Sequence, residues 1–238
     1  MVEVAHRGGL AGAAGATGPT VVIDTFRAFS TTAFLIAAGA GPIVLAETTE
    51  EARETAIRLG DAILCGEDRG RMPPDFDLGN SPGEVLDAGD LSGRAVVQRT
   101  SAGTRCARAA VRSGAHPLLV AGLVVASATA DALAGEASIT IVASGRLGTV
   151  PTAEDDATAE LIEALLIGAP CNVAELIANI RNSSSADRLR TADWSHAADL
   201  DLCLAVDRFG FFMQVAAVGG YVIVERGTSR ERRIGRTR

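Results

Sequence analysis

Residues 20–32 read TVVIDTFRAFSTT, and the rest of the predicted fold is arranged around this stretch. A short β-branched run ends on the carboxylate of Asp24, Arg27 follows three residues later, and three hydroxyl residues then open an apolar helical pattern. In α/β folds ligands bind at the carboxyl ends of strands, and the first amides of a helix bind anions. The stretch therefore predicts a strand that ends in a site residue, beside a helix N-terminus that binds a phosphate. The alternative is that Asp24 only makes the turn after the strand.

The same alternation of strand and helix continues along the chain. Apolar runs predict strands at 20–23, 42–45, 62–65, 95–98, 117–121 and 138–143. Helical patterns follow these strands at 31–39, 49–59, 104–113, 125–134 and 154–167, with further helices at 172–181 and 197–206 and a hairpin over 211–225. This order predicts an α/β fold: a mostly parallel sheet with helices on both faces, plus a C-terminal antiparallel hairpin. An arrangement in two α/β lobes that meet at the site is left open.

Composition predicts the domain boundaries. Residues 1–19 are small and glycine-rich, which indicates a flexible N-terminal segment ahead of an α/β domain over 20–225. Residues 226–238 carry six arginines and no apolar period, so we expect a solvated tail. Within the domain, the stretch GEDRGRMPPDFDLGNSP (66–82) shows no periodicity, and a loop this long in a compact domain is usually functional or disordered. Its cluster of charges favours function.

The charged residues exclude several classes of protein. All 22 basic residues are arginine, so a P-loop NTPase and Schiff-base chemistry, which both need a lysine, are ruled out. The net charge of −7 and the 4% of aromatic residues argue against nucleic-acid binding. An anion would therefore be bound by arginine, by backbone amides and by a metal ion.

Apolar residues and cysteines indicate where the protein works. Hydrophobic residues make up 47% of the chain, enough for a large core, but no charge-free apolar run of 18 residues predicts a membrane helix. We see no signal peptide before the first strand and expect a cytoplasmic protein without membrane contacts. The four cysteines lie far apart without metal-ligand spacing and are expected to be small buried apolar residues: Cys65, Cys106, Cys171 and Cys203.

Four carboxylates lie just past predicted strands or at a helix start: Asp24, Glu67, Glu154 and Asp155. Mg²⁺ usually takes one or two carboxylates, water molecules and phosphate oxygens, so these four are the candidate metal ligands. The helix dipole is the alternative reason for acidic residues at 154–156. Asp24, Arg27 and Glu67 are the candidate catalytic residues, and Arg69 and Arg105 can bind further anionic groups.

A second turn repeats the first. Residues 99–104 again run from a strand through small hydroxyl residues to a helix N-terminus, so two turns at one sheet edge can hold one anion.

A haloacid-dehalogenase-type phosphatase is a weaker interpretation, because Phe26 stands where that family has a second aspartate and its lysine is absent. A dinucleotide site is also disfavoured, since no GxGxxG follows the first strand. The histidines at 6, 116 and 196 form no evident catalytic set.

Several motifs resemble those of the 2-phosphosulfolactate phosphatase family. DTFRAFSTT (24–32) resembles its D-x-x-R-A-x-[ST]-T signature, and GEDRG…FDLGNSP (66–82) resembles its GE-x-x-G…F-x-x-GNSP block. TSAGTR (100–105) is similar to a T-x-N-GTR loop, Glu154-Asp155 to an ED pair that opens a helix, and VDRFGFF (206–212) to a D-R-F segment. The sequence departs from the pattern in two places: Ala102 stands in place of Asn, and Pro151-Thr152-Ala153 precedes the acidic pair in place of Ser-Leu.

The resemblance implies a Mg²⁺-dependent phosphatase that converts 2-phospho-3-sulfolactate to 3-sulfolactate and phosphate, a step of coenzyme M biosynthesis. Besides the candidate metal ligands, the resemblance points to a set of substrate-binding residues, to which we add Arg69 and Ser101. The full set is Arg27, Ser30, Thr31, Arg69, Asn80, Ser81, Thr100, Ser101, Gly103, Thr104 and Arg105. The alternative is a non-catalytic relative that binds a small phosphorylated anion, which the Ala102 departure would favour. The sequence is silent on oligomeric state and is compatible with a homo-oligomer.

Overall fold

The computed structural model describes residues 2–227, and their strands form a single sheet. The strands are β1 Glu3–Gly8, β2 Gly18–Ile23, β3 Ile43–Ala46, β4 Ile63–Gly66, β5 Leu78–Gly79, β6 Val96–Arg99, β7 Ala115–Ala121, β8 Ser138–Ala143, β9 Phe212–Val218 and β10 Tyr221–Gly227. The helices are α1 Gly9–Ala14, α2 Ala28–Ala37, α3 Thr49–Leu59, α4 Pro82–Ala88, α5 Gly103–Arg112, α6 Ala126–Leu133, α7 Ala153–Ile167, α8 Val173–Arg181, α9 Ser184–Thr191 and α10 Asp199–Cys203.

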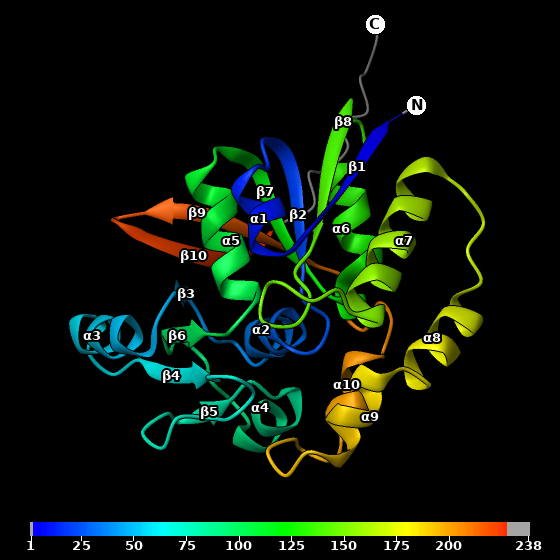
Figure 1. Cartoon of the computed structure of the whole chain (residues 1–238). Coiled ribbons are helices and arrows are strands. Elements are labelled where there is room, and N and C mark those ends of the chain that lie inside the picture. Colours follow the sequence, from blue (N-terminus) through cyan, green and yellow to red (C-terminus); the bar gives the residue numbers. More distant parts are fainter. Residues whose placement is uncertain (1, 228–238) are drawn as a thin grey trace, which may run out of the picture.

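The ten strands lie in the order β1-β8-β2-β7-β9-β10-β3-β6-β4-β5 (Figure 1). The first four form one parallel group and the last four form another. The hairpin β9–β10 lies between them, antiparallel to β7 on one side and to β3 on the other. The predicted α/β fold, its mostly parallel sheet and its C-terminal antiparallel hairpin are confirmed. Unexpectedly, the hairpin lies in the middle of the sheet and joins its two halves.

The order of the strands in the sheet determines where the loops after them meet. Three antiparallel pairings separate β7 from β3, so the two parallel groups run in opposite directions. Figure 1 shows the sheet strongly twisted, with the strand ends of both groups directed toward α2 in the middle of the molecule. The loops that follow β2, β4, β6 and β8 therefore meet there, and the contacts of Asp24 with Gly103 described below join the two groups directly.

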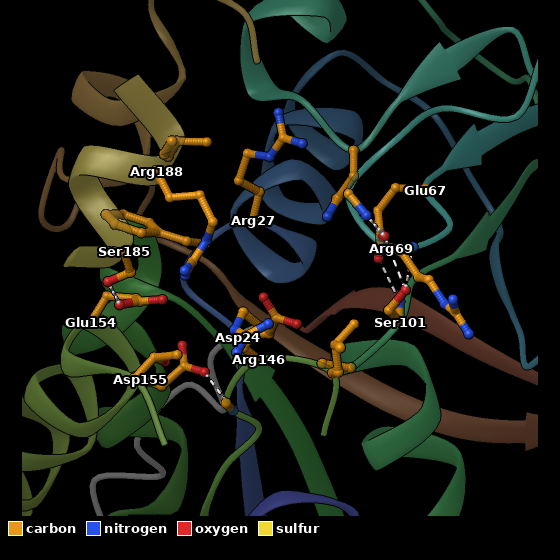
Figure 2. A pocket seen from close by; sticks show the side chains of 18 of the residues that line it. Asp24, Arg27, Glu67, Arg69, Ser101, Arg146, Glu154, Asp155, Ser185 and Arg188 are labelled. Atoms are coloured by element: carbon orange, nitrogen blue, oxygen red, sulfur yellow. Dashed lines mark hydrogen bonds between the residues drawn. The ribbon is translucent and has the colours of Figure 1, made fainter. Parts of the chain in front are cut away.

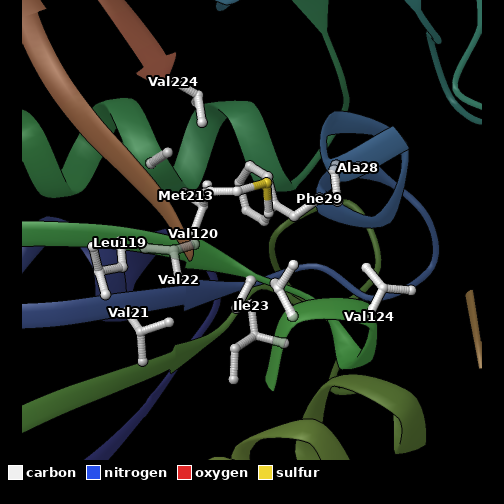
Figure 3. Close-up of a cluster of buried hydrophobic side chains, with 14 of the residues drawn as sticks. Val21, Val22, Ile23, Ala28, Phe29, Leu119, Val120, Val124, Met213 and Val224 are labelled. Atoms are coloured by element: carbon white, nitrogen blue, oxygen red, sulfur yellow. The ribbon is translucent and has the colours of Figure 1, made fainter. Parts of the chain in front are cut away.

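The core explains why the strands read as continuous apolar runs. Residues 20–23 of β2 and 43–46 of β3 are buried at every position, as expected for parallel strands covered on both faces. α5 packs against β2, β3 and β7, and α6 and α7 pack together against β2, β7, β8 and β9. Figure 3 shows Val22, Val120 and Phe29 meeting Met213 of the hairpin, so the last strands complete the same core.

The N-terminal segment differs from the prediction. Residues 3–14, which we expected to be flexible, form the edge strand β1 and the helix α1. β1 pairs in parallel with β8 over six residues, and α1 packs on α5. The strand was missed because most of its side chains are exposed at the sheet edge, so its sequence EVAHRG shows no apolar alternation.

Other differences lie in polar stretches. The 66–82 loop contains the short strand β5, and α4 and α9 are two helices that were not predicted. Arg226 and Gly227 end β10, and the rest of the expected tail lies outside the described residues. Cys65, Cys106 and Cys203 are buried as predicted, but Cys171 is exposed. No helix within residues 2–227 combines the length and apolar character needed to cross a membrane.

Candidate functional site

A pocket of about 270 Å³ lies where the strand ends of the two groups meet (Figure 2). Its polar lining consists of four carboxylates, four arginines and several amide or hydroxyl groups, among them Asp24, Glu67, Glu154, Asp155, Arg27, Arg69, Arg146, Arg188, Asn80, Ser101, Thr152 and Ser185. Phe26, Leu147, Leu189 and Trp194 supply its apolar surface. None of the three histidines lines it.

Asp24 is held by the two helix N-termini that we had predicted for a phosphate. It follows β2 directly, and its Oδ1 accepts the Ala28 N–H of α2 at 3.1 Å, while its Oδ2 accepts the Gly103 N–H of α5 at 2.8 Å. The two repeated turns do hold one anion, but that anion is the carboxylate of Asp24. A phosphate in the pocket must therefore find other partners.

The acidic pair at the start of α7 forms the neighbouring wall. Asp155 accepts the Thr25 N–H at 2.7 Å and the Gly145 N–H at 2.8 Å, so it ties together the loops after β2 and β8. Glu154 accepts a hydrogen bond from the hydroxyl of Ser185 on α9. Both carboxylates are only 3% exposed, so the favourable helix dipole does not fully account for their position.

Glu67 faces the site from the second parallel group. It follows Gly66 at the end of β4 and accepts hydrogen bonds from the Ser101 N–H, the Ser101 hydroxyl and the Gly70 N–H. Gly66 has φ +135°, and a Cβ there would lie 1.9 Å from the Arg99 carbonyl oxygen. The glycine therefore lets the strand turn sharply enough to place Glu67 against the loop after β6.

Burial and mutual repulsion shape the charge of the carboxylates. The pKa of Asp24 is raised to about 7, chiefly by burial and also by the negative charges of Glu67 and Glu154, while the hydrogen bonds from Ala28 and Gly103 act against this rise. Burial, then the charges of Asp24 and Glu154, hold the pKa of Asp155 well above its usual range. Burial also raises the pKa of Glu154, against the Ser185 hydrogen bond and the positive charge of Arg188. A cation between these groups would relieve the repulsion.

The donor set fits a hard cation. All four candidate ligands supply carboxylate oxygens, which Mg²⁺ prefers, and each bound oxygen keeps a second lone pair. Within residues 2–227, no three acidic, histidine or cysteine side chains are already grouped as a metal site. The arrangement therefore suits an ion held by one or two carboxylates, with water and substrate oxygens as its remaining ligands.

Arg27 has a partner that the sequence did not reveal. Its Nη1 donates to Asp199 of α10 at 2.5 Å, and its guanidinium lies 4.8 Å from the centre of the Trp194 ring. Asp199 is fully buried and also accepts hydrogen bonds from the Ser81 hydroxyl and the Gly83 and His196 amides. Arg27 lines the pocket, but one end of its guanidinium is committed to this buried pair.

Several predicted substrate-binding residues lie behind the pocket wall. The Ser30 hydroxyl donates to the Thr25 carbonyl, Thr100 and Thr104 bond to each other, and Ser81 bonds to Asp199. The hydroxyl of Thr31 is buried without a partner among the described residues, and Arg105 makes one long contact of 3.5 Å to the Ser101 carbonyl. Gly103 contributes through its backbone N–H, which donates a hydrogen bond to Asp24. Of the predicted substrate-binding set, Arg27, Arg69, Asn80 and Ser101 line the pocket.

Two arginines in the lining were not predicted. Arg146 lies in the loop after β8, next to Gly145, whose N–H binds Asp155. Because ligands in α/β folds bind at the carboxyl ends of strands, its position after a strand was a signal that could have identified it. Arg188 lies on α9, whose sequence SSADRLRT carries no signal of a site. The departure at Ala102 also falls on the pocket wall, where this side chain is 7% exposed.

Comparisons with known proteins agree with the resemblance that the sequence motifs indicated. A family model described as 2-phosphosulpholactate phosphatase matches residues 11–217. A Deinococcus radiodurans protein is 40% identical over 148 residues, 61% of either chain, and a Thermoplasma acidophilum protein is 32% identical over 188 residues, 79% of this chain and 81% of the relative. A Thermus thermophilus protein is 43% identical over 99 residues, which cover 42% of this chain but only 40% of the relative. All three relatives carry the name "Probable 2-phosphosulfolactate phosphatase".

Proposed function

Because the chain belongs to the 2-phosphosulfolactate phosphatase family, we propose that it is a Mg²⁺-dependent phosphatase that hydrolyses 2-phospho-3-sulfolactate to 3-sulfolactate and phosphate. The matched stretches cover only 40% and 61% of the Thermus and Deinococcus relatives, so the activity rests on the site as well as on this membership. The residues of the family motifs that we predicted as metal ligands all line one pocket.

The observation that carries the proposal is the opposition of charges in this pocket. Its inner wall holds four carboxylates, each at most 6% exposed, and burial raises the pKa of three of them. A protein that bound only an anion would gain nothing from these groups. Their presence beside four arginines fits a ligand pair, a divalent cation together with a phosphate ester.

The residues divide into two tasks. Asp24 and Glu154 would hold the ion, with Glu67 and Asp155 as the further candidates; when bound, Mg²⁺ supplies positive charge to the phosphoryl oxygens. Asp24 is fixed by two backbone amides and Glu67 by three hydrogen bonds, so neither has to reorganise when substrate enters. Arg27 and Arg69 would bind phosphate oxygens, because guanidinium groups bind such oxygens bidentately.

The test is phosphate release from 2-phospho-3-sulfolactate, from phospholactate and from phenyl phosphate, each with Mg²⁺ and with EDTA. We expect metal-dependent release that favours the sulfonate substrate. Release from phospholactate or phenyl phosphate but not from 2-phospho-3-sulfolactate would support a phosphatase and contradict the proposed substrate. Absence of turnover by folded protein with Mg²⁺ would contradict the phosphatase.

The alternative is a non-catalytic protein that binds a small phosphorylated anion, and Ala102 is the observation in its favour. Ala102 lines the pocket in place of an amide side chain that could contact substrate. Strong binding of the phosphate ester that is insensitive to EDTA, with no turnover, would favour this alternative. A substrate affinity that rises with Mg²⁺ would count against it.

A further inference from the structure

The predicted phosphate ligands leave two arginines of the pocket unexplained, Arg146 and Arg188. Both side chains are exposed, as is that of Arg69, whereas Arg27 and the four carboxylates of the pocket are buried. Neither guanidinium has a carboxylate within salt-bridge distance or a hydrogen-bond acceptor in the part of the chain that the structure describes. Figure 2 shows Arg188 on the side of the pocket where Glu154 lies and Arg146 in the middle of the view, between Asp155 and Ser101.

Arg146 is carried by a turn that is fixed to the acidic wall. Its N–H donates to the Val150 carbonyl at 2.7 Å and its carbonyl accepts the Val150 N–H at 3.1 Å. Gly145 beside it has φ +64° and donates its N–H to Asp155. The turn therefore sets the position of the Arg146 backbone before any ligand binds.

Arg188 is carried by a helix that is fixed to the same wall. α9 is capped by Ser183 and bound to Glu154 through Ser185, one turn before Arg188. Arg188 and Glu154 both line the pocket, and Figure 2 shows Arg188 on the Glu154 side, but no ion pair joins the two among the described residues. The next arginine of the helix, Arg190, is different: it pairs with Asp187 and does not line the pocket.

The pocket thus has two layers of charge. A phosphate accompanied by a cation suits the buried carboxylates, and further acidic groups of the same ligand suit the exposed arginines above them. A simple phosphate ester would leave this outer layer unused. A ligand with additional sulfonate or carboxylate groups would fill both layers.

We propose that Arg146 and Arg188 form an outer anion subsite, which binds the sulfonate and carboxylate groups of the substrate that take no part in the reaction. The subsite rests on the proposed function, because that function supplies the substrate. The two arginines determine specificity: they select small phosphate esters that carry further acidic groups and leave the phosphate itself to the inner wall.

The first experiment compares substrates across variants. We expect Arg146→Ala and Arg188→Ala each to lower kcat/KM for 2-phospho-3-sulfolactate by about 10- to 100-fold, mainly through KM, since each removes hydrogen bonds to a charged group. The value for phenyl phosphate, which has no further acidic group, should change little. Arg190→Ala is the matched control and should behave as the wild type. An equal loss on both substrates would overturn the proposal.

The second experiment does not need turnover. Calorimetry with Mg²⁺ measures the affinity for 3-sulfolactate, which carries the sulfonate and carboxylate but no phosphate. We expect wild type and Arg190→Ala to bind it and the two subsite variants to bind it at least about tenfold more weakly. This result would support the subsite even if no ester were hydrolysed, so failure of the proposed function is seen separately. No binding by the wild type, or equal affinity in all variants, would overturn the subsite.

Discussion

Gly103 shows how a single residue joins the two halves of the site. Its N–H, at the start of the α5 helix that follows β6, reaches Asp24 across the boundary between the two parallel groups. A Cβ at this position would lie 2.7 Å from Asp24 Oδ2 and 2.8 Å from the Ala28 Cβ. The close approach of backbone and carboxylate therefore requires glycine, whatever its φ.

Replacing this glycine should damage stability and activity together. We expect Gly103→Ala to lower the free energy of unfolding by about 1–3 kcal/mol, because the added methyl group overpacks a buried contact. Phosphate release should fall as Asp24 is displaced. Urea denaturation and the phosphatase assay measure the two effects. Gly210→Ala is the control, since its Cβ meets nothing within 4 Å, and equal behaviour of the two variants would contradict this account.

The carboxylate itself is tested by Asp24→Asn. We expect kcat/KM to fall by about 100-fold or more, because the variant removes a fixed charge from the site. Asp77→Asn is a matched control: Asp77 also accepts a backbone N–H, that of Leu64, but lies outside the pocket lining. Circular dichroism should show both variants folded. Wild-type activity in Asp24→Asn would remove Asp24 from the mechanism.

At the scale of the elements, α10 matters more than its five residues suggest. Through Asp199 it binds Arg27 at the start of α2, Ser81 at the start of α4 and the chain at His196. Both partners of the ion pair are almost fully buried, Arg27 at 4% exposure and Asp199 at 0%. This pair sets where α2 and the 66–82 loop lie relative to the pocket.

Replacing one partner of the Arg27–Asp199 pair should lower the stability more than replacing both partners. We expect Asp199→Asn to lower the free energy of unfolding by about 3–5 kcal/mol, because it leaves the Arg27 charge buried without its partner. Adding Arg27→Met should restore part of this stability but none of the activity. Urea denaturation of the two single variants and the double variant completes the cycle. Simple additivity of the two losses would show that the pair is not coupled.

Some elements and site residues could be predicted from the sequence for clear physical reasons. β2 and β3 are buried on both faces, so their β-branched runs identify them, and Asp24 and Glu67 follow from the ends of their strands. β1 was missed because an exposed edge strand needs no apolar pattern. Asp199 and Arg188 were missed because they reach the site only through tertiary packing. The sequence assigns the hydroxyl groups of Ser30 and Thr100 to a ligand, but in the structure both form hydrogen bonds within the protein. Serine and threonine serve in both roles, so the residue type alone does not separate them.

For the molecule as a whole, the buried acids make stability depend on pH. The pKa of Asp24 is raised to about 7 and those of Glu154 and Asp155 are also raised, so the folded state binds these protons more tightly than the unfolded state. Their contribution is complete at acidic pH and is lost as the pH rises through the folded pKa values.

Without divalent cations, therefore, the melting temperature should be lower at pH 8 than at pH 6. Each kcal/mol lost corresponds to about 2–4 °C for a domain of this size. Adding Mg²⁺ should raise the value more at pH 8, because the ion binds the ionised carboxylates. Thermal melts in EDTA and in Mg²⁺ at both pH values measure this. A melting temperature in EDTA that is equal or higher at pH 8 would contradict the prediction.

The central position of β9–β10 has a consequence for synthesis on the ribosome. Every strand of both parallel groups emerges before residue 212, where the hairpin that joins them begins. Until then β7 and β3 each present an open edge, which is free to pair with another chain. A nascent chain that stops before the hairpin therefore holds two unfinished half-sheets. We expect such fragments to aggregate, and the protein to reach its native state only after translation has passed its last strands.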